Sequence, residues 1–365
     1  LNYLVYIAAK ILRKRPKQIT FLAPAVTYWM TILAGTGHTA YAALPVINEV
    51  AKEGNIRPSK PLSIAVVSSQ VAITASPISA AVVIFASFLE PFGVSYIQLL
   101  IIAIPSTMIA CMVGSVISNL LGKTLKDDPI YQQRLQEGLV KTSSQEVDRS
   151  SSKEAKMSVI IFVIAVLFVV TYATIISKKL GLVAEPMLAR NQAIMAIMLT
   201  AATAITVVCK IKVSEITNMS TFKSGMSAAV CVLGVAWLGN TFVSNHIDEI
   251  KTFSAGLLDT YPWMLAVVLF IASMLLYSQA ATTSALMPAA LALGVSPIAA
   301  IAAFAAVSAL FVLPTYPTLL AAVEMDDTGS TRIGKFVFDH PFLIPGVVTI
   351  TVSVILAFII GQLVI

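Results

Sequence analysis

Small polar residues interrupt four apolar stretches of this sequence, and their types suit the binding of an anion inside a membrane. Two interruptions, at Ala34–Thr39 and Tyr277–Ala280, divide short apolar stretches, and prolines break two longer ones, at Pro77 and at Pro314 with Pro317. A helix that restarts at such a point carries unpaired N–H groups and partial positive charge, which favour a carboxylate. The candidate binding residues are Thr36, Gly37, His38, Thr39, Gln70, Thr74, Ser76, Pro77, Ser278, Gln279, Thr282, Thr283, Pro314, Thr315 and Pro317.

Individual members of this set have simpler alternative roles. Ser and Thr in membrane helices often bond the carbonyl of the preceding turn, and a single proline often only kinks a helix. His38 could donate a hydrogen bond to a substrate or move a proton, and it could equally stabilise the turn around it. Backbone carbonyls freed at the same breaks could hold Na⁺, although nothing in the sequence requires that ion. The sequence predicts no cofactor and no resident metal.

Enzyme classes lack their motifs here. No HExxH, GxSxG or Walker-type GxxxxGK[ST] pattern occurs, and no aspartate lies within the apolar runs to form a catalytic pair. Cys111, Cys209 and Cys231 all lie in apolar runs without a CxxC spacing, which fits small apolar residues better than a disulfide or a metal site. The sequence therefore predicts that the protein is not an enzyme.

The composition places the candidate residues in a membrane. Of 365 residues, 58% are hydrophobic and 12% are charged, and the mean hydropathy is +0.88. Soluble domains contain roughly 25% charged residues, so this chain has too little polar surface to cover a water-soluble core. The sequence predicts an all-α polytopic membrane protein.

Charged segments divide the chain into apolar runs of two kinds. Runs near or above the roughly 20 residues that cross a bilayer are read as spans; they are 62–89, 97–121, 157–176, 191–209, 224–245, 298–323 and 341–365. Residues 18–50 and 262–293 each contain two shorter apolar stretches, which we interpret as re-entrant hairpins. Two ordinary short helices in a thinned bilayer are the alternative for each.

The distribution of basic residues predicts the orientation. If residues 10–17 lie in the cytoplasm, only Lys178, Lys179, Arg190 and Lys251 of the 24 Lys and Arg residues fall on the opposite side, as the positive-inside rule demands. The segment 122–156, rich in serine and mixed charges, becomes a flexible cytoplasmic linker. The net charge of +6 then belongs mostly to cytoplasmic loops, so we expect no nucleic-acid partner.

The same order of features occurs on both sides of the linker. Thr36 precedes Pro45 by the same spacing with which Gln279 precedes Pro288, and each hairpin is followed by an apolar run broken by proline. We interpret the halves, 1–121 and 157–365, as inverted repeats, each with a re-entrant hairpin and a broken transmembrane helix. Such repeats are typical of secondary transporters, whose substrate site lies where the half-helices meet.

Five short motifs carry a resemblance to a known family. They are Ile32–Gly37 (ILAGTG), Val71–Ser79 (VAITASPIS), Leu313–Thr318 (LPTYPT), Asp326–Gly329 (DDTG) with Thr331–Gly334 (TRIG), and Asp127–Tyr131 (DDPIY). The sequence resembles the anaerobic C4-dicarboxylate transporters of bacteria (the Dcu family), more the A type than the B type, over essentially its whole length.

The resemblance implies a carrier in the inner membrane that takes up fumarate, malate or aspartate in exchange for succinate. It also implies membership of the ion transporter superfamily, with an elevator-type motion and a homodimer. Relatives carry two or three further apolar helices before the start of this sequence, so its N-terminal helices are expected to be missing. The alternatives are a Na⁺- or H⁺-coupled symporter of another organic or inorganic anion, and a membrane co-sensor partner of a dicarboxylate sensor kinase.

Overall fold

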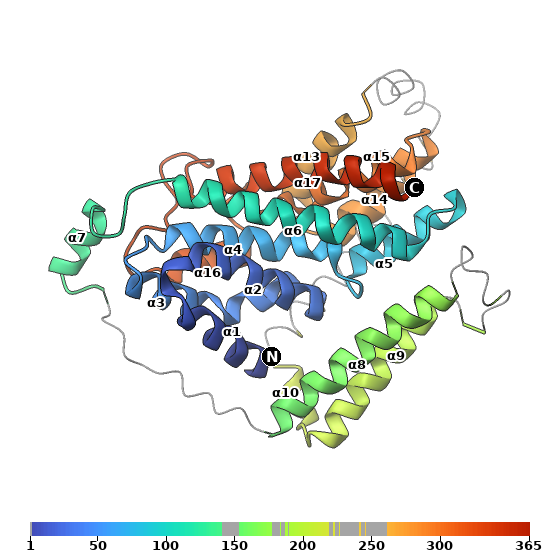
Figure 1. Cartoon of the computed structure of the whole chain (residues 1–365), viewed down its shortest axis with the longest axis horizontal. Helices are drawn as coiled ribbons and strands as arrows, with labels where there is room; N and C mark the ends of the chain where they lie inside the picture. Colours follow the sequence, from blue (N-terminus) through green and yellow to red (C-terminus); the bar gives the residue numbers. More distant parts are fainter. Residues whose placement is uncertain are drawn as a thin grey trace.

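The computed structural model describes residues 2–140, 153–176, 190–218 and 261–365, with a few single positions between them (Figure 1). Within these residues the chain forms helices joined by turns and loops and contains no strand, which confirms the all-α prediction for this part. The predicted span 224–245 lies outside the described residues except for three single positions.

Before residue 140 the chain forms α1 (Asn2–Lys14), η1 (Pro16–Gln18), α2 (Ile19–Ala34), η2 (Gly37–Ala42), α3 (Leu44–Glu53), α4 (Ser59–Val71), η3 (Ala72–Ala75), α5 (Ala80–Leu89), η4 (Glu90–Phe92), α6 (Tyr96–Leu120) and α7 (Pro129–Gln136), where η marks a 3₁₀ helix. After residue 152 it forms α8 (Lys153–Ile175), α9 (Arg190–Val208), α10 (Val213–Ile216), α13 (Met264–Leu276), α14 (Gln279–Ala292), α15 (Pro297–Ala303), η5 (Phe304–Phe311), α16 (Pro317–Met325) and α17 (Leu343–Val364).

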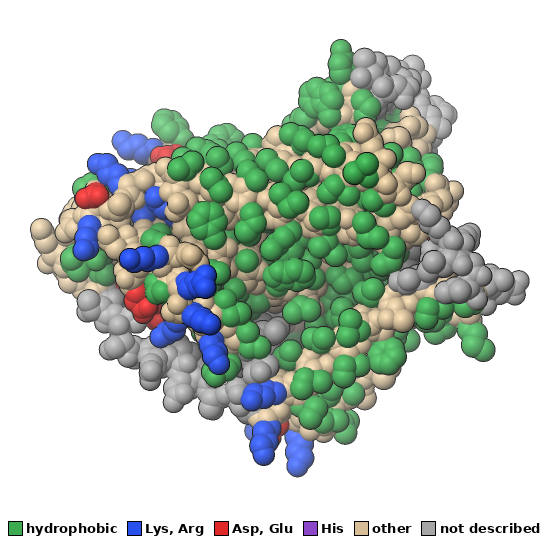
Figure 2. Space-filling view, viewed as in Figure 1, with side chains coloured by type: hydrophobic (Ala, Val, Ile, Leu, Met, Phe, Trp, Pro, Cys, Tyr) green, Lys and Arg blue, Asp and Glu red, His purple; other side chains and the backbone are tan. Residues whose placement is uncertain are grey.

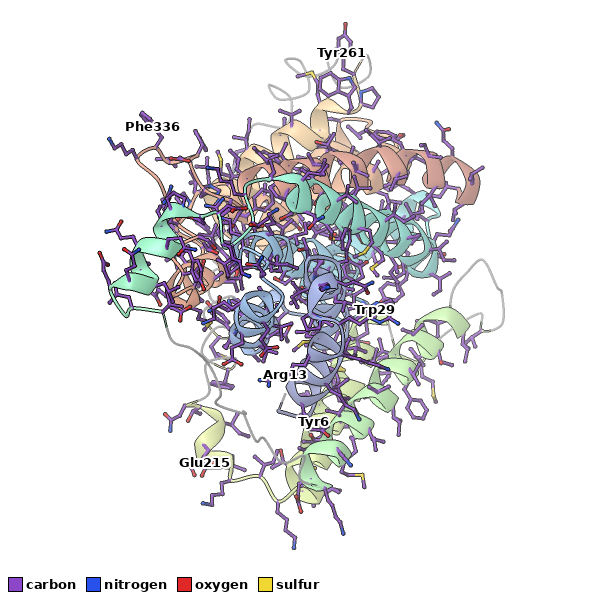
Figure 3. All side chains as sticks on the ribbon, turned by 60° about the vertical axis from the view of Figure 1, so that its left-hand side comes forward. Tyr6, Arg13, Trp29, Glu215, Tyr261 and Phe336 are labelled. Atoms are coloured by element: carbon purple, nitrogen blue, oxygen red, sulfur yellow. The ribbon has the colours of Figure 1, made fainter. Side chains whose placement is uncertain are left out.

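Four described segments are long and apolar enough to cross a membrane: Ser59–Phe92, Tyr96–Leu120, Lys153–Tyr172 and Leu343–Val364. In Figure 2 hydrophobic side chains are spread over the visible surface along the helices, while Lys and Arg gather at the end near α3, α7 and α10. In Figure 3 Trp29 and Tyr6 lie on the outside of the helices, and both are exposed. An apolar belt with charge at one end is the surface expected of a protein surrounded by lipid.

The first interrupted stretch, 18–50, forms a helix–turn–helix. Helix α2 ends at Gly35, whose φ of 69° is left-handed and whose N–H donates to the Thr31 carbonyl at 2.8 Å. The close approach of Ile78, which a Cβ on Gly35 would meet at 3.0 Å, also requires glycine there. The chain then forms η2 and enters α3 through Pro45, which suits the first turn of a helix.

The run 62–89 breaks where the prolines predict. Helix α4 and the turn η3 end at Ser76, which is extended (φ −81°, ψ 124°), and α5 starts at Ala80. The Ser79 hydroxyl caps α5 by accepting from the Val82 N–H at 3.2 Å. Pro77 lies inside the break, where its missing N–H group interrupts the hydrogen bonds between successive helical turns.

The stretch 262–293 forms a second helix–turn–helix, α13 followed by α14. The turn is Tyr277, which adopts a left-handed φ of 51°, and Ser278, which is extended. The Ser278 hydroxyl caps α14 by accepting from the Ala281 N–H at 3.2 Å. Pro288 lies inside α14.

The run 298–323 also breaks at its prolines. Helix α15 continues into η5, which is kinked at Ser308 and Ala309, and α16 starts at Pro317. The Ser273 hydroxyl of α13 supports the kink, since it donates to the Ala306 carbonyl at 2.9 Å and accepts from the Ala309 N–H at 3.2 Å. This contact replaces hydrogen bonds that the kink removes from the helix.

Two long helices from different halves of the sequence, α6 and α17, pack against each other. Helices α6 and α17 lie side by side in Figure 1, and α2 packs against both α4 and α6. Glycine allows a close approach of these two helices: a Cβ on Gly114 of α6 would lie 2.1 Å from the Thr349 Oγ1 of α17. Small residues at such contacts are typical of helix packing in membranes.

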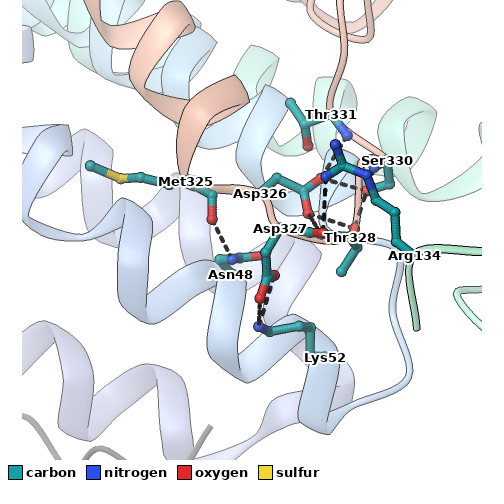
Figure 4. Close-up of polar contacts among 9 residues, drawn as sticks. All are labelled: Asn48, Lys52, Arg134, Met325, Asp326, Asp327, Thr328, Ser330 and Thr331. Atoms are coloured by element: carbon teal, nitrogen blue, oxygen red, sulfur yellow. Dashed lines mark hydrogen bonds and ion pairs between the residues drawn. The ribbon is translucent and has the colours of Figure 1, made fainter. Parts of the chain in front are cut away.

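A buried polar loop follows α16 (Figure 4). The Asp326 carboxylate is 3% exposed and accepts from the N–H groups of Thr328 (2.9 Å) and Thr331 (2.6 Å) and from the Ser330 hydroxyl (2.8 Å). A buried carboxylate needs this many donors to offset its desolvation. The loop is therefore ordered by its own aspartate.

The same loop contacts α3 and the segment 122–140. Lys52 lies 2.9 Å from the Asp327 carboxylate, Asn48 donates to the Met325 carbonyl at 2.7 Å, and Arg134 of α7 donates to the Asp327 carbonyl at 3.0 Å (Figure 4). The expectation of a flexible linker over 122–156 thus does not hold for 122–140, because α7 and its arginine pack on the loop after α16.

Candidate functional site

Gln70 joins the two breaks and the second hairpin. It lies in the last turn of α4 and is fully buried. Its side-chain amide donates to the Thr318 hydroxyl of α16 at 3.1 Å and accepts from the Gln279 amide of α14 at 3.1 Å. Its backbone carbonyl accepts from the Ser308 hydroxyl of η5 at 3.1 Å. Three segments of the second half of the chain, α14, η5 and α16, therefore meet at one glutamine of the first half.

The first hairpin tip packs directly on this glutamine. A Cβ on Gly37 would lie 3.0 Å from both the Gln70 Nε2 and the Ser69 carbonyl oxygen, so only glycine permits the contact without displacement. The Thr36 hydroxyl lies 3.1 Å from the His38 Nδ1, and the Thr39 hydroxyl donates to the Thr36 carbonyl at 3.1 Å. When the Thr36 hydroxyl donates to Nδ1, the neutral His38 ring carries its proton on Nε2.

Three tyrosines connect the first tip to the second break. The His38 ring stacks on Tyr41 with centroids 5.8 Å apart and lies 6.2 Å from the ring of Tyr316, which in turn stacks on Tyr277 at 6.2 Å. The Tyr277 hydroxyl is hydrogen-bonded to the Thr315 hydroxyl. A chain of ring contacts, ending in the hydrogen bond from Tyr277, thus links His38 to Thr315. The sequence predicted both of these residues.

The sequence reasoning did not select these tyrosines, nor Ser308 and Thr318. Tyr277 and Tyr316 are adjacent to predicted residues, so their position beside a break was the signal that could have found them. Thr318 directly follows Pro317 and had the same signal. Ser308 had no local signal, because it becomes part of the site only through its bond to Gln70.

Several predicted hydroxyls are hydrogen-bonded to the backbone. Thr282 donates to the Ser278 carbonyl at 2.8 Å and Thr283 to the Gln279 carbonyl at 2.7 Å, which is the common bond to the preceding turn. Thr74 donates to the Val71 carbonyl at 2.8 Å. These hydroxyl protons are used locally, although each oxygen can still accept a bond.

Ser76 and Pro77 position the first break. The Ser76 hydroxyl donates to the Ile32 carbonyl in α2 at 2.7 Å, and the Pro77 carbonyl accepts from the Tyr96 hydroxyl of α6. Both residues are buried. In the second break Pro314 is half-buried, while Thr315 and Pro317 are exposed. The first break is therefore held by its neighbours, and the second is more open.

This arrangement presents neutral donors and acceptors. The groups around Gln70 are hydroxyls, amides, phenols and the imidazole of His38. The described ranges contain no group of three or more His, Cys, Asp or Glu side chains able to hold a metal ion. Neutral donors suit an anion in a membrane interior, where a permanent cation would be costly.

A sequence model for the family described as "Anaerobic c4-dicarboxylate membrane transporter" matches residues 1–365. The chain belongs to this family. Members of the anaerobic C4-dicarboxylate transporter family are transporters and not enzymes, which confirms both the resemblance and the non-enzymatic prediction. Family membership and the apolar helices together identify a multi-pass membrane protein.

Curated members of the family are similar over nearly all of this chain. The C4-dicarboxylate transporter DcuA of Wolinella succinogenes is 61% identical over 363 residues, which cover 100% of this chain and 84% of that protein. The DcuA of Escherichia coli K12 is 56% identical, over 99% of this chain and 84% of that protein. The anaerobic C4-dicarboxylate transporter DcuB of Escherichia coli O6:H1 is 34% identical, over 98% and 82%. No solved structure matches.

Proposed function

We propose that this protein exchanges C4-dicarboxylates across the bacterial inner membrane, taking up fumarate, malate or aspartate and releasing succinate. Relatives with 54–61% identity carry the name C4-dicarboxylate transporter DcuA. The observation that carries the proposal for this chain is the junction at Gln70, where the α4 break, the second hairpin and the second break are joined by hydrogen bonds.

One carboxylate of the substrate binds near Gln70, and the other binds near His38. The Gln279 amide donates to the Gln70 side-chain carbonyl, and the Gln70 amide donates to Thr318. An entering carboxylate accepts the N–H groups that these bonds release. The His38 Nε2 and the Tyr41 and Tyr316 hydroxyls supply donors on the other side. Charge-assisted hydrogen bonds of this kind are stronger than the neutral ones they replace.

The two halves act as inverted repeats in an elevator-type carrier. Support comes from the repeated order of helix–turn–helix, broken helix and long helix, in α2 to α6 and again in α13 to α17. In such carriers the substrate site lies at the meeting point of broken helices, which here is the surroundings of Gln70. The protein works as a homodimer, with the segment at 122–156 and the other Lys- and Arg-rich loops in the cytoplasm.

Exchange in proteoliposomes tests the function. The purified full chain is reconstituted with succinate inside, and labelled fumarate is supplied outside, with and without Na⁺ and with and without a pH gradient. We expect fumarate entry that requires internal succinate and is independent of Na⁺. Entry without internal succinate but dependent on Na⁺ or H⁺ identifies a symporter and contradicts exchange.

A co-sensor without transport is the other outcome. In that case reconstituted protein carries no fumarate at all, while pull-down from detergent retains a dicarboxylate sensor kinase. Phosphate and chloride, supplied as competing anions, check the substrate class: we expect neither to inhibit fumarate entry.

A further inference from the structure

A basic cavity of about 250 Å³ lies at the charge-rich end of the helices, away from the junction at Gln70. Its wall comes from the start of α4, the end of α6 and the loop before α17, and its cationic members are Arg57, Lys60 and Arg332. One carboxylate, Asp339, also lines it. Three cationic side chains against one lining carboxylate leave a net positive charge, which favours an anion.

The cavity is built by specific contacts. Arg57 forms an ion pair with Asp128 at 2.8 Å, and Gly122 adopts a φ of 71° beside it. A Cβ on Gly122 would lie 2.6 Å from the Arg57 Nη1, so glycine leaves the space that this guanidinium occupies. Lys60 donates to the Asn119 carbonyl at 2.8 Å. Arg57 and Lys60 are thus held in the wall, and Arg332 is exposed at its rim.

Polar groups other than the cations complete the lining. The hydroxyls of Ser63 and Ser118 lie 3.2 Å apart, and the Ser118 hydroxyl donates to the Lys60 carbonyl. His340 is 8% exposed; its Nε2 lies 3.0 Å from the Val312 carbonyl oxygen, and its Nδ1 has no hydrogen-bond partner within the described residues. A buried polar atom without a hydrogen-bond partner is unusual in the interior of a folded protein.

Exposed apolar residues lie next to the cavity in the sequence on two of its elements. Phe336, Val337 and Phe338 directly precede the lining residue Asp339 and are exposed at 77%, 52% and 55%. In Figure 3 the Phe336 side chain projects away from the helices. Leu120 and Leu121 at the end of α6 are also exposed. Aromatic and aliphatic residues beside a basic pocket at a helix end match the boundary between lipid tails and headgroups.

We propose that this cavity binds the phosphate of an anionic phospholipid in the leaflet on that side of the membrane. The phosphate lies among Arg57, Lys60 and Arg332, and the acyl chains lie along Phe336 and Phe338. The volume is below the roughly 300–1,000 Å³ of pockets that enclose whole drug-sized ligands, which fits a headgroup better than a nucleotide. This lipid site rests on the proposed function only for the side of the membrane. In the orientation proposed above, the cavity faces the cytoplasmic leaflet.

Thermal unfolding of the purified full chain in detergent tests the site. The titrants are dioctanoyl phosphatidylglycerol, dioctanoyl phosphatidylcholine and inorganic phosphate. We expect phosphatidylglycerol to raise the Tm in a saturable manner and the other two to have little effect. Equal shifts from phosphatidylglycerol and phosphatidylcholine would overturn the anion site, and equal shifts from phosphatidylglycerol and inorganic phosphate would overturn the lipid as its ligand.

Matched variants locate the binding. Arg332→Gln should weaken the apparent phosphatidylglycerol affinity roughly fivefold, since one basic residue near an anionic lipid contributes about that factor. Arg332→Lys should retain it, and Lys335→Gln, on the same loop but outside the cavity, should not change it. An equal loss in Lys335→Gln would overturn the assignment. Fumarate binding, measured on the same samples, reports the proposed function separately, because lipid binding in detergent requires no transport.

Discussion

The Gln279 Nε2 lies 3.1 Å from the Gln70 Oε1, although 209 positions separate the two residues in the sequence. Both side chains are buried, Gln70 completely. Each belongs to a different half of the chain, and each is beside an interruption of its helix. A hydrogen bond between them therefore holds the first helix break against the second hairpin.

Removing this amide should affect both binding and stability. In Gln70→Ala, Gln279 and Thr318 lose a buried partner, which costs on the order of 1–3 kcal/mol for each buried group left unsatisfied. We expect fumarate affinity, measured by calorimetry, to fall at least tenfold and the Tm in detergent to decrease. Gln70→Glu should abolish binding with a smaller change in fold, because a carboxylate repels the substrate.

A second buried glutamine provides the control for Gln70. Gln98 is also buried, in α6, and its amide contacts the Ser95 N–H and the Val364 carbonyl. Gln98→Ala should lower the Tm to a similar extent and leave fumarate affinity unchanged. If Gln98→Ala and Gln70→Ala weakened binding equally, Gln70 would have only a structural role.

The two proline breaks should be necessary for binding. Pro77→Ala and Pro314→Ala restore an N–H group and remove the ring that clashes with the preceding turn, so the helices should continue and the exposed half-helix ends should be lost. We expect weaker fumarate binding in both variants, while the protein still reaches the membrane. Pro105 lies inside the unbroken helix α6, and Pro105→Ala should bind normally. Near-normal affinity in both break variants would contradict the proposed site.

His38 should act as a hydrogen-bond donor. Its Nδ1 is engaged by Thr36, which leaves Nε2 for a substrate oxygen. The amide of Asn can supply an N–H at the same place, whereas Ala leaves the carboxylate one donor short. The loss of one hydrogen bond to a charged group costs about 1.5–3 kcal/mol, or roughly ten- to hundredfold in affinity.

We therefore expect His38→Asn to retain exchange of labelled fumarate for succinate and His38→Ala to lose most of it. The measurement is the initial rate of exchange in proteoliposomes, together with fumarate affinity in detergent. Exchange that fails in His38→Asn while binding persists would instead indicate proton transfer by the imidazole.

The orientation can be read by labelling single cysteines in a background without Cys111, Cys209 and Cys231. A cysteine at Lys335, which is exposed near the basic end, should react only when an impermeant reagent reaches the cytoplasm. A cysteine at Phe92, exposed between α5 and α6, should react from outside intact cells. Reaction of the Lys335 position in intact cells would reverse the orientation. Ser330 is unsuitable as a probe, since it is 3% exposed and bonded to Asp326.

Local signals in the sequence predicted the helices and their interruptions. Apolar runs marked α6 and α17, and Pro77, Pro314 and Pro317 marked the breaks, because proline cannot donate the hydrogen bond that a continuing helix needs. The motif Gly35-Thr36-Gly37 marked the first turn, because only glycine readily adopts the left-handed φ found at Gly35. These features depend on a few neighbouring residues, so the sequence determined them directly.

The tertiary structure alone decided which polar residues meet. Thr318 and Gln279 contact Gln70 across 248 and 209 positions, and Tyr316 approaches His38 from the opposite half of the chain. Helix α7 was expected to be part of a flexible linker. Instead its Arg134 donates a hydrogen bond to the carbonyl of Asp327, which is distant in the sequence. Such contacts depend on how helices pack, and hydrophobic packing constrains the faces of helices without specifying individual hydrogen bonds. The sequence therefore supplied the candidate groups, and only the packed helices determined that Gln70 lies at their centre.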